Sequence, residues 1–189
     1  MHLIVYLHGF KSSPSSNKAV LTQSALLQYA GVQWYCPQLS PSPKLAMQEV
    51  CNHIQKQTYQ KISVIGSSLG GYYATYLAEK FACKASLLNP AIEPARDLEK
   101  YIGEQKTWQG DDSFYFKPEY IHELKELYVS QIKHPERYQL LVAKGDEVLD
   151  WKEMVAKYPG SSQIILEGGD HAISDYPEHL SEILRFQLD

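Results

Sequence analysis

The chain has 189 residues, of which 44% are hydrophobic and 21% are charged. This length suits one domain of the usual ~150 residues, and such a domain can bury a core without a disulfide or a metal. The composition is neither disordered nor membrane-spanning, and a formal net charge of -4 argues against a nucleic-acid-binding surface.

The three cysteines, Cys36, Cys51 and Cys83, are scattered without CxxC spacing. We therefore expect no disulfide framework and no zinc knuckle, and a reducing compartment such as the cytoplasm. The apolar stretch Leu3–Leu7 is too short for a signal peptide or a membrane span, so neither is expected.

Six short apolar runs recur along the chain and predict strands. They are Leu3–Leu7, Val32–Cys36, Lys61–Ile65, Ala85–Leu88, Leu140–Ala143 and Gln163–Leu166. Their apolar residues are fairly continuous rather than alternating, which is typical of parallel strands covered on both faces.

Helical spacing predicts helices between these runs. They are Asn17–Tyr29, a helix opened by Ser42-Pro43, Leu69–Phe81, a helix opened by a capping box at Asp150 and Glu153, and Pro177–Leu188. Strand–helix alternation of this kind predicts an α/β fold with right-handed crossovers. We expect one domain over residues 1–189, with a mostly parallel sheet between two helical layers.

The segment from Ala95 to Pro135 interrupts this alternation. Of its 41 residues 14 are charged, no strand is evident, and aromatic residues recur through it. Long segments of this kind inside compact domains are often lids or binding elements. We expect a small helical cap over residues 95–135, in which Tyr115, Phe116 and Tyr120 contact the substrate; a surface excursion that only packs on the sheet is the alternative.

Ser68 is the candidate nucleophile. It lies in Gly66-Ser67-Ser68-Leu69-Gly70, a G-x-S-x-G pattern between a predicted strand and a predicted helix. A nucleophile on so sharp a turn needs nearly side-chain-free residues two positions before and after it. Ser68 has Gly66 and Gly70 there, whereas Ser67 would have Ile65 and Leu69.

His171 is the candidate base. It follows the last predicted strand in Gly168-Gly169-Asp170-His171, at the strand end where open α/β sheets hold their sites. The order nucleophile, acid, base is the one expected of this elbow. The acid is then Asp146, the first acidic residue after the strand Leu140–Ala143. Asp150 is the runner-up because it has a competing task as a helix cap, and Glu147 has no predictable direction.

An oxyanion site needs two N–H donors. One is the N–H of Leu69, directly after Ser68, and the other is the N–H of Phe10 in the loop after the first strand. His8 in that loop precedes the nucleophile, so we expect it to shape the loop rather than act as the base.

Five motifs in this order resemble the small bacterial α/β-hydrolase esterases of the YqiA type. They are His8-Gly9-Phe10, Gly66–Tyr73, Leu88-Asn89-Pro90-Ala91, Gly145–Asp150 and Glu167–His171. The resemblance implies an α/β-hydrolase-like sandwich with about six strands, and hydrolysis of small-molecule carboxylic esters, without a metal or organic cofactor, by Ser68, Asp146 and His171.

Three alternatives remain open at this stage. An acyl-CoA thioesterase would use the same triad, with Lys11 and Lys18 near a phosphate; a carbon–carbon hydrolase or peptidase could occupy the same scaffold; and a non-catalytic binding protein could retain the fold.

Overall fold

Six parallel strands form the main sheet of the computed structural model, which describes residues 1–108 and 112–189. In spatial order the strands are β2 (Val32–Tyr35), β1 (His2–Leu7), β3 (Lys61–Ser67), β4 (Lys84–Leu88), β7 (Tyr138–Ala143) and β8 (Ser162–Leu166). Every neighbouring pair is parallel. Each strand overlaps one of the six predicted runs, so the prediction of a six-stranded parallel sheet is confirmed.

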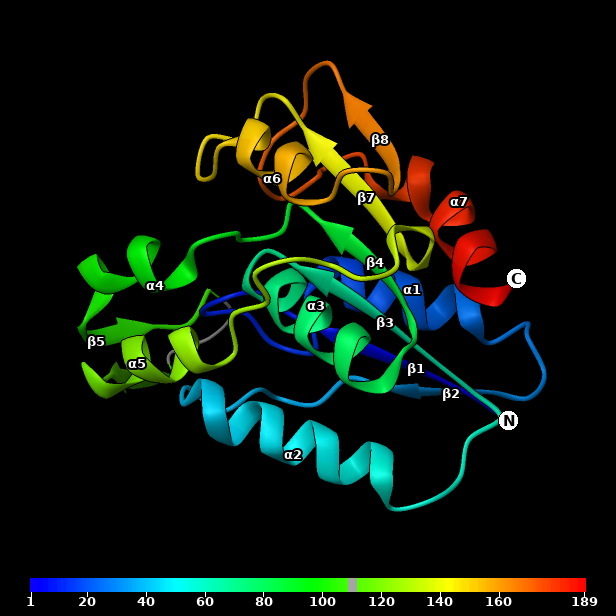
Figure 1. Cartoon of the computed structure of the whole chain (residues 1–189), viewed down its shortest axis with the longest axis horizontal. Coiled ribbons are helices and arrows are strands. Elements are labelled where there is room, and N and C mark those ends of the chain that lie inside the picture. The colour runs from blue at the N-terminus through cyan, green and yellow to red at the C-terminus, as the bar shows by residue number, and fades with distance from the viewer. Residues whose placement is uncertain (109–111) are drawn as a thin grey trace.

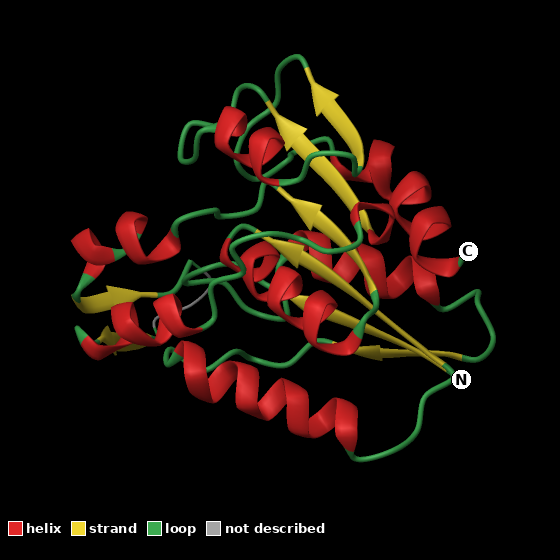
Figure 2. Cartoon of the chain, viewed as in Figure 1, coloured by secondary structure: helices red, strands yellow, loops and turns green. Residues whose placement is uncertain are grey.

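Helices cover both faces of this sheet (Figure 1, Figure 2). On one face lie α1 (Asn17–Leu26) and α7 (Tyr176–Leu188), and on the other lie α2 (Pro43–Gln55), α3 (Leu69–Phe81) and α6 (Trp151–Lys157). Side chains of β1 divide between the two layers, since Leu3 and Val5 enter the core beneath α2 and α3 while Ile4 and Tyr6 enter the core beneath α1 and α7. The predicted three-layer α/β architecture is thereby confirmed.

The helix starts follow the predicted caps with one exception. Ser42 accepts a hydrogen bond from the Leu45 N–H at the start of α2, and Asp150 accepts one from the Lys152 N–H at the start of α6. The predicted capping box at α6 is only half formed, because Glu153 turns away to bind the Arg96 guanidinium through both carboxylate oxygens, at 3.0 and 2.8 Å.

The segment 95–135 contains strands that the sequence did not predict. After α4 (Pro94–Asp97) and a short 3-10 turn, η1 (Glu99–Tyr101), the strands β5 (Gly103–Lys106) and β6 (Ser113–Phe116) form an antiparallel hairpin, followed by α5 (Glu119–Glu126). A second 3-10 turn, η2 (Pro135–Arg137), leads into β7. The small helical cap expected over residues 95–135 lacked this hairpin: the segment is a mixed unit of two short helices and a hairpin, at the left of Figure 1.

Hydrogen bonds tie this unit to the helices of the main domain. Glu123 on α5 accepts from the Ser42 hydroxyl at 2.6 Å and from the Lys44 N–H at 3.0 Å, at the start of α2. Arg96 on α4 binds α6 through Glu153. The unit is thus anchored at two sides of the same helical layer.

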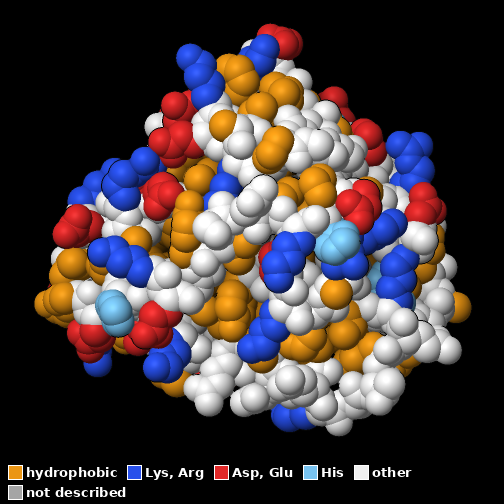
Figure 3. Space-filling view, viewed as in Figure 1, with side chains coloured by type: hydrophobic (Ala, Val, Ile, Leu, Met, Phe, Trp, Pro, Cys, Tyr) orange, Lys and Arg blue, Asp and Glu red, His pale blue; other side chains and the backbone are white. Residues whose placement is uncertain are grey.

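The surface in Figure 3 carries acidic and basic side chains interspersed with apolar ones. Among the residues that the structure describes, no helix combines the length and apolar character needed to cross a membrane.

Candidate active site

Ser68 occupies a strained turn between β3 and α3. Its backbone has φ 56° and ψ -121°, a left-handed φ that side-chain-bearing residues rarely adopt. A Cβ on Gly66 would lie 2.1 Å from the Gly70 carbonyl oxygen, and one on Gly70 would lie 1.9 Å from that of Leu7. The two glycines therefore let α3 start directly against β3 and β1, which lifts Ser68 above the sheet edge.

A continuous chain of hydrogen bonds links Ser68 to a buried carboxylate. The Ser68 Oγ lies 3.0 Å from His171 Nε2, and His171 Nδ1 lies 2.8 Å from Asp146 Oδ2. The other oxygen of Asp146 accepts the N–H groups of Val148 and Leu149, both at 2.8 Å. Since a carboxylate only accepts, Nδ1 carries the imidazole proton and Nε2 is left to accept from Ser68.

Burial of the pair is unequal. The side chain of Asp146 is fully buried, while that of His171 keeps 22% of its surface exposed. The carboxylate is thereby shielded from water, and the imidazole retains an open edge toward the cleft beside Ser68.

The other acidic candidates have different partners. Asp150 caps α6, Glu147 accepts the backbone N–H of His171 at 3.0 Å, and Asp170 binds both the N–H and the hydroxyl of Ser174. Those bonds to Ser174 lower the pKa of Asp170. Asp146 is therefore the carboxylate that contacts the imidazole, and Glu147 and Asp170 hold the loop that carries it.

Close backbone contact brings the loops of Asp146 and His171 together. The Gly145 N–H donates to the Gly168 carbonyl at 3.2 Å, and a Cβ on Gly145 would lie 2.3 Å from the Gly169 carbonyl oxygen. Glycine before Asp146 is thus required by the approach of the loop that follows β8.

The two expected oxyanion donors, the N–H groups of Phe10 and Leu69, belong to the two segments next to Ser68. Within the described residues, neither the Phe10 N–H nor the Leu69 N–H donates a hydrogen bond to the protein. An ideal Cβ on Gly9 would lie 3.2 Å from the Cβ of Ser68, so the loop after β1 approaches the serine closely. Both donors therefore remain available to a ligand beside Ser68.

His8 holds that loop in shape. Its Nε2 accepts the Leu39 N–H at 3.1 Å, so Nδ1 carries the proton and donates to the Gly9 carbonyl at 3.0 Å. Burial lowers the pKa of His8, which keeps the ring neutral. These contacts match the expectation that His8 shapes the loop.

Asn89 is a residue of the site that sequence reasoning missed. It is fully buried, has φ 41°, and follows β4. Its amide donates to the carbonyls of Asp170 at 3.0 Å and His171 at 3.2 Å, while its Oδ1 accepts the Ala143 N–H at 2.9 Å. One side chain thus joins the end of β7, which leads to Asp146, to the loop of His171. The available signal was an asparagine, tolerant of left-handed φ, between a strand and a proline.

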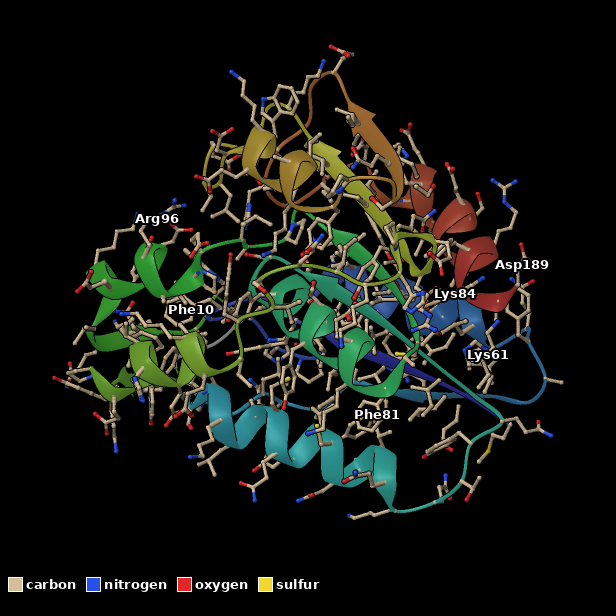
Figure 4. All side chains as sticks on the ribbon, viewed as in Figure 1. Phe10, Lys61, Phe81, Lys84, Arg96 and Asp189 are labelled. Atoms are coloured by element: carbon tan, nitrogen blue, oxygen red, sulfur yellow. The ribbon has the colours of Figure 1, made fainter. Side chains whose placement is uncertain are left out.

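The predicted aromatic contacts are only partly brought to the site. Phe116 is buried, and its ring centroid lies 5.2 Å from that of Phe10. In Figure 4 the label of Phe10 lies among the green ribbons of the segment 95–135. Tyr120 packs behind Phe116 at 5.5 Å. Tyr115 is 55% exposed and lines neither cleft at the site, because alternate residues of β6 face opposite ways. Phe114, on the same side as Phe116, takes the position expected of Tyr115.

Two clefts meet at the loop after β1. The first, of about 370 Å³, contains Ser68 and His171 with Lys18, Trp108 and Glu147 in its wall. The second, of about 280 Å³, has Leu39, Leu69, Tyr73, Phe114 and Phe116 in its wall. His8, Gly9, Phe10 and Ser12 line both, so the loop that carries the Phe10 N–H separates the two clefts.

Trp108 ties the hairpin to this loop. Its backbone N–H donates to the Lys11 carbonyl at 2.8 Å and its indole N–H to the Phe10 carbonyl at 3.2 Å. The described residues contain no group of three or more His, Cys, Asp or Glu side chains arranged to hold a metal ion.

Sequence comparison finds relatives along the whole chain. The model of UPF0227, described as an uncharacterised protein family, matches residues 3–188. A UPF0227 protein of Shewanella loihica is 25% identical over 193 residues, and the UPF0227 protein YcfP of Salmonella gallinarum is 23% identical over 191 residues, with 98% of both chains covered in each case.

Structural comparison agrees on the fold. A crystal structure from Agrobacterium vitis S4 has a TM-score of 0.82 at 16% identity, covering 98% of this chain and 88% of the other. Est1E from Butyrivibrio proteoclasticus with bound ferulic acid has a TM-score of 0.73 at 16% identity, covering 100% and 90%. Mouse alpha/beta hydrolase domain-containing protein 10 has a TM-score of 0.74 at 16% identity, covering 97% and 89%. The chain has the α/β-hydrolase fold.

Proposed function

The chain belongs to the UPF0227 family, and we propose that this protein is a serine hydrolase that cleaves carboxylic esters. The proposal starts from the hydrogen bonds that link Ser68, His171 and Asp146. That chain of hydrogen bonds is the observation that carries the proposal. A neutral imidazole whose Nε2 accepts from a serine hydroxyl can remove the proton that makes the oxygen nucleophilic.

The mechanism follows from these roles. Ser68 Oγ attacks the acyl carbonyl while His171 takes its proton, and Asp146 stabilises the imidazolium that forms. The N–H groups of Phe10 and Leu69 bind the negative oxygen, the latter at the positive end of α3. The imidazolium then protonates the departing alcohol, and water, deprotonated by His171, cleaves the acyl-enzyme to release the acid.

The comparisons give this proposal chemical context. Est1E, whose structure holds ferulic acid, and one chain from a structure described under the lipolytic enzymes LipS and LipT have the same fold. At 16% identity this likeness concerns the fold, so the ester substrate rests on the site geometry.

We extend the proposal to residues 95–135 as a cap on the site. Two observations support it: the Phe10 ring packs against the rings of Tyr101, Phe114 and Phe116, and Trp108 binds two carbonyls of the same loop. In this role the cap walls the cleft and holds the loop that supplies the Phe10 N–H.

Labelling by a fluorophosphonate and turnover of p-nitrophenyl esters test the proposal. We expect the protein to be labelled at Ser68, and Ser68→Ala to lose labelling and ester turnover while its circular dichroism and melting temperature stay native-like. Ser24→Ala, at an exposed serine of α1, is the matched control and keeps both activities.

Two results would contradict it. A folded Ser68→Ala protein with full turnover would remove Ser68 as nucleophile, and an unlabelled wild-type protein would favour a non-catalytic binding role. Comparing kcat/KM for an oxygen ester and a thioester with the same acyl group separates an esterase from a thioesterase.

A further inference from the structure

We infer that the two clefts divide the substrate: the acyl group occupies the cleft between the loop after β1 and β6, and a polar leaving group occupies the cleft beside His171. This inference rests on the proposed ester hydrolysis at Ser68. It assigns a substrate class to the site, namely esters of a short acyl group with a polar alcohol.

The position of His171 decides which cleft receives the leaving group. In the tetrahedral intermediate the carbon carries the Ser68 oxygen, the oxyanion, the leaving oxygen and the acyl carbon. His171 Nε2 must give its proton to the leaving oxygen, so that oxygen faces the cleft in which His171 lies. With the leaving oxygen in that cleft, the acyl carbon is assigned to the other cleft, which is lined by Leu69, the residue directly after Ser68.

The floor of the acyl cleft is apolar and buried. Leu39, Leu69, Tyr73 and Phe116 are each no more than 9% exposed, and Phe114 extends this wall from β6. Its charged residues, Lys11 and Asp112, are not buried. Such a wall favours an uncharged acyl group.

Its size limits the acyl group. At about 280 Å³ the cleft falls just below the ~300–1,000 Å³ of sites that hold drug-sized ligands. A short aliphatic chain or a single aromatic ring fits this space, whereas a long fatty acyl chain has to extend beyond it into solvent.

The leaving-group cleft has charged and hydroxyl-bearing side chains close to His171. Lys18 and Glu147 both line it, together with the hydroxyl-bearing residues Ser12 and Ser16. The Lys18 Nζ donates to the Ala172 carbonyl, which fixes the amine beside the His171 loop. Charges of both signs and hydroxyl groups suit an alcohol that carries further hydroxyl or other polar groups.

Two crossed substrate series test the division. The first varies the acyl group from acetate to octanoate with p-nitrophenol as constant leaving group, and the second compares monobutyrate esters of glycerol and hexanol. We expect the wild-type protein to prefer short acyl groups and the glycerol ester.

Each variant should change one series only. Leu39→Ala enlarges the acyl cleft and raises the octanoate-to-butyrate ratio of kcat/KM about tenfold or more, with the alcohol preference unchanged. Lys18→Met reduces the preference for glycerol over hexanol and leaves the acyl profile unchanged. Ser113→Phe, at an exposed residue of the acyl cleft, narrows this cleft and lowers the octanoate-to-butyrate ratio of kcat/KM. This variant keeps the test valid if Leu39→Ala does not fold.

The outcomes separate this inference from the proposed function. Suppose that fluorophosphonate still labels Ser68. The division of the substrate is then wrong, and the esterase proposal stands, if Leu39→Ala or Ser113→Phe alters the alcohol preference or if Lys18→Met alters the acyl profile. The same conclusion follows if no variant alters either series. If the wild-type protein is neither labelled nor active, the proposed function itself fails.

Discussion

At the scale of single residues, the site depends on which acidic side chain the turn after β7 directs inward. Asp146 and Asp150 are four positions apart, and an aspartate can either orient a histidine or cap a helix. In the structure the Asp146 side chain is inward, held by the N–H groups of Val148 and Leu149, whereas Asp150 starts α6. The sequence predicted that Asp150 caps the following helix. Because Asp150 had that role, Asp146 was the aspartate expected to bind the His171 imidazole.

We predict opposite results for the two amide substitutions. Asp146→Asn removes the charge that stabilises the imidazolium and allows the wrong histidine tautomer, so kcat should fall by about three to four orders of magnitude, as when the acid of a serine-protease triad becomes an amide. Asp150→Asn keeps a good N-cap, so kcat and the free energy of unfolding should change little. Steady-state kinetics and urea unfolding measure both; an equal loss of kcat in the two variants would contradict the assignment of the acid.

Asn89 shows what the sequence does not reveal at this scale. Its role depends on three hydrogen bonds to residues 54 to 82 positions away in the chain. No local pattern encodes such partners, because they meet only once β4, β7 and the loop after β8 are side by side. Tyr115 was misassigned for a related reason: the register of an unrecognised strand decides which of its neighbours face inward.

At the scale of elements, the sequence predicted the buried strands and missed the exposed ones. The six strands of the main sheet were predicted from their apolar runs. β5 reads Gly-Glu-Gln-Lys and contains no apolar side chain, and β6 reads Ser-Phe-Tyr-Phe, only four residues long. These strands are stabilised by packing of the Phe10 ring on Phe114 and Phe116, which is a long-range contact.

The turn between β3 and α3 gives a sharp prediction at this scale. Gly70→Ala should disrupt the elbow, because its Cβ would lie 1.9 Å from the Leu7 carbonyl oxygen, which belongs to backbone that cannot rotate away. We expect a loss of more than about 3 kcal/mol in the free energy of unfolding, together with lost fluorophosphonate labelling.

Gly168→Ala is its matched control. An added Cβ there meets nothing within 4 Å, so the free energy of unfolding should stay within about 0.5 kcal/mol of the wild-type value. Urea denaturation of both variants provides the measurement, and a Gly70→Ala protein as stable and as readily labelled as Gly168→Ala would show that the close approach is not needed.

At the scale of the whole molecule, the two edges of the sheet have different tasks. The residues after β1, β3, β4, β7 and β8 meet at the carboxyl edge and form the site, as expected for a parallel sheet. At the opposite edge Lys61 and Lys84 donate to the carbonyls of Leu188 and Phe186 and so hold the end of α7 (Figure 4). Substitutions at that edge should therefore alter stability and leave the chemistry of the site intact.

His2 makes this edge sensitive to pH. Its Nε2 lies 2.8 Å from the Ser63 hydroxyl, and burial, followed by the positive charges of Lys61, the N-terminus and Lys84, lowers its pKa from 6.5 to about 4. Between these two values the unfolded chain binds more protons than the folded one, so the folded state loses stability as the pH falls from about 6.5 to about 4. Because His2 is only half buried, we expect about 1 kcal/mol from it after solvent screening.

We therefore predict that His2→Gln makes stability less dependent on pH. Urea unfolding at about pH 7.5 and about pH 5 should show a smaller loss for His2→Gln than for the wild-type protein, since glutamine has no proton to gain. His122→Gln is the control, because His122 exposes 78% of its side chain on α5, far from this edge in sequence, and should lose as much stability as the wild-type protein does. An unchanged loss in His2→Gln would mean that protonation of other groups destabilises the acidified fold. Fluorophosphonate labelling of His2→Gln at the higher pH should match the wild-type level, because the substitution lies at the edge opposite Ser68.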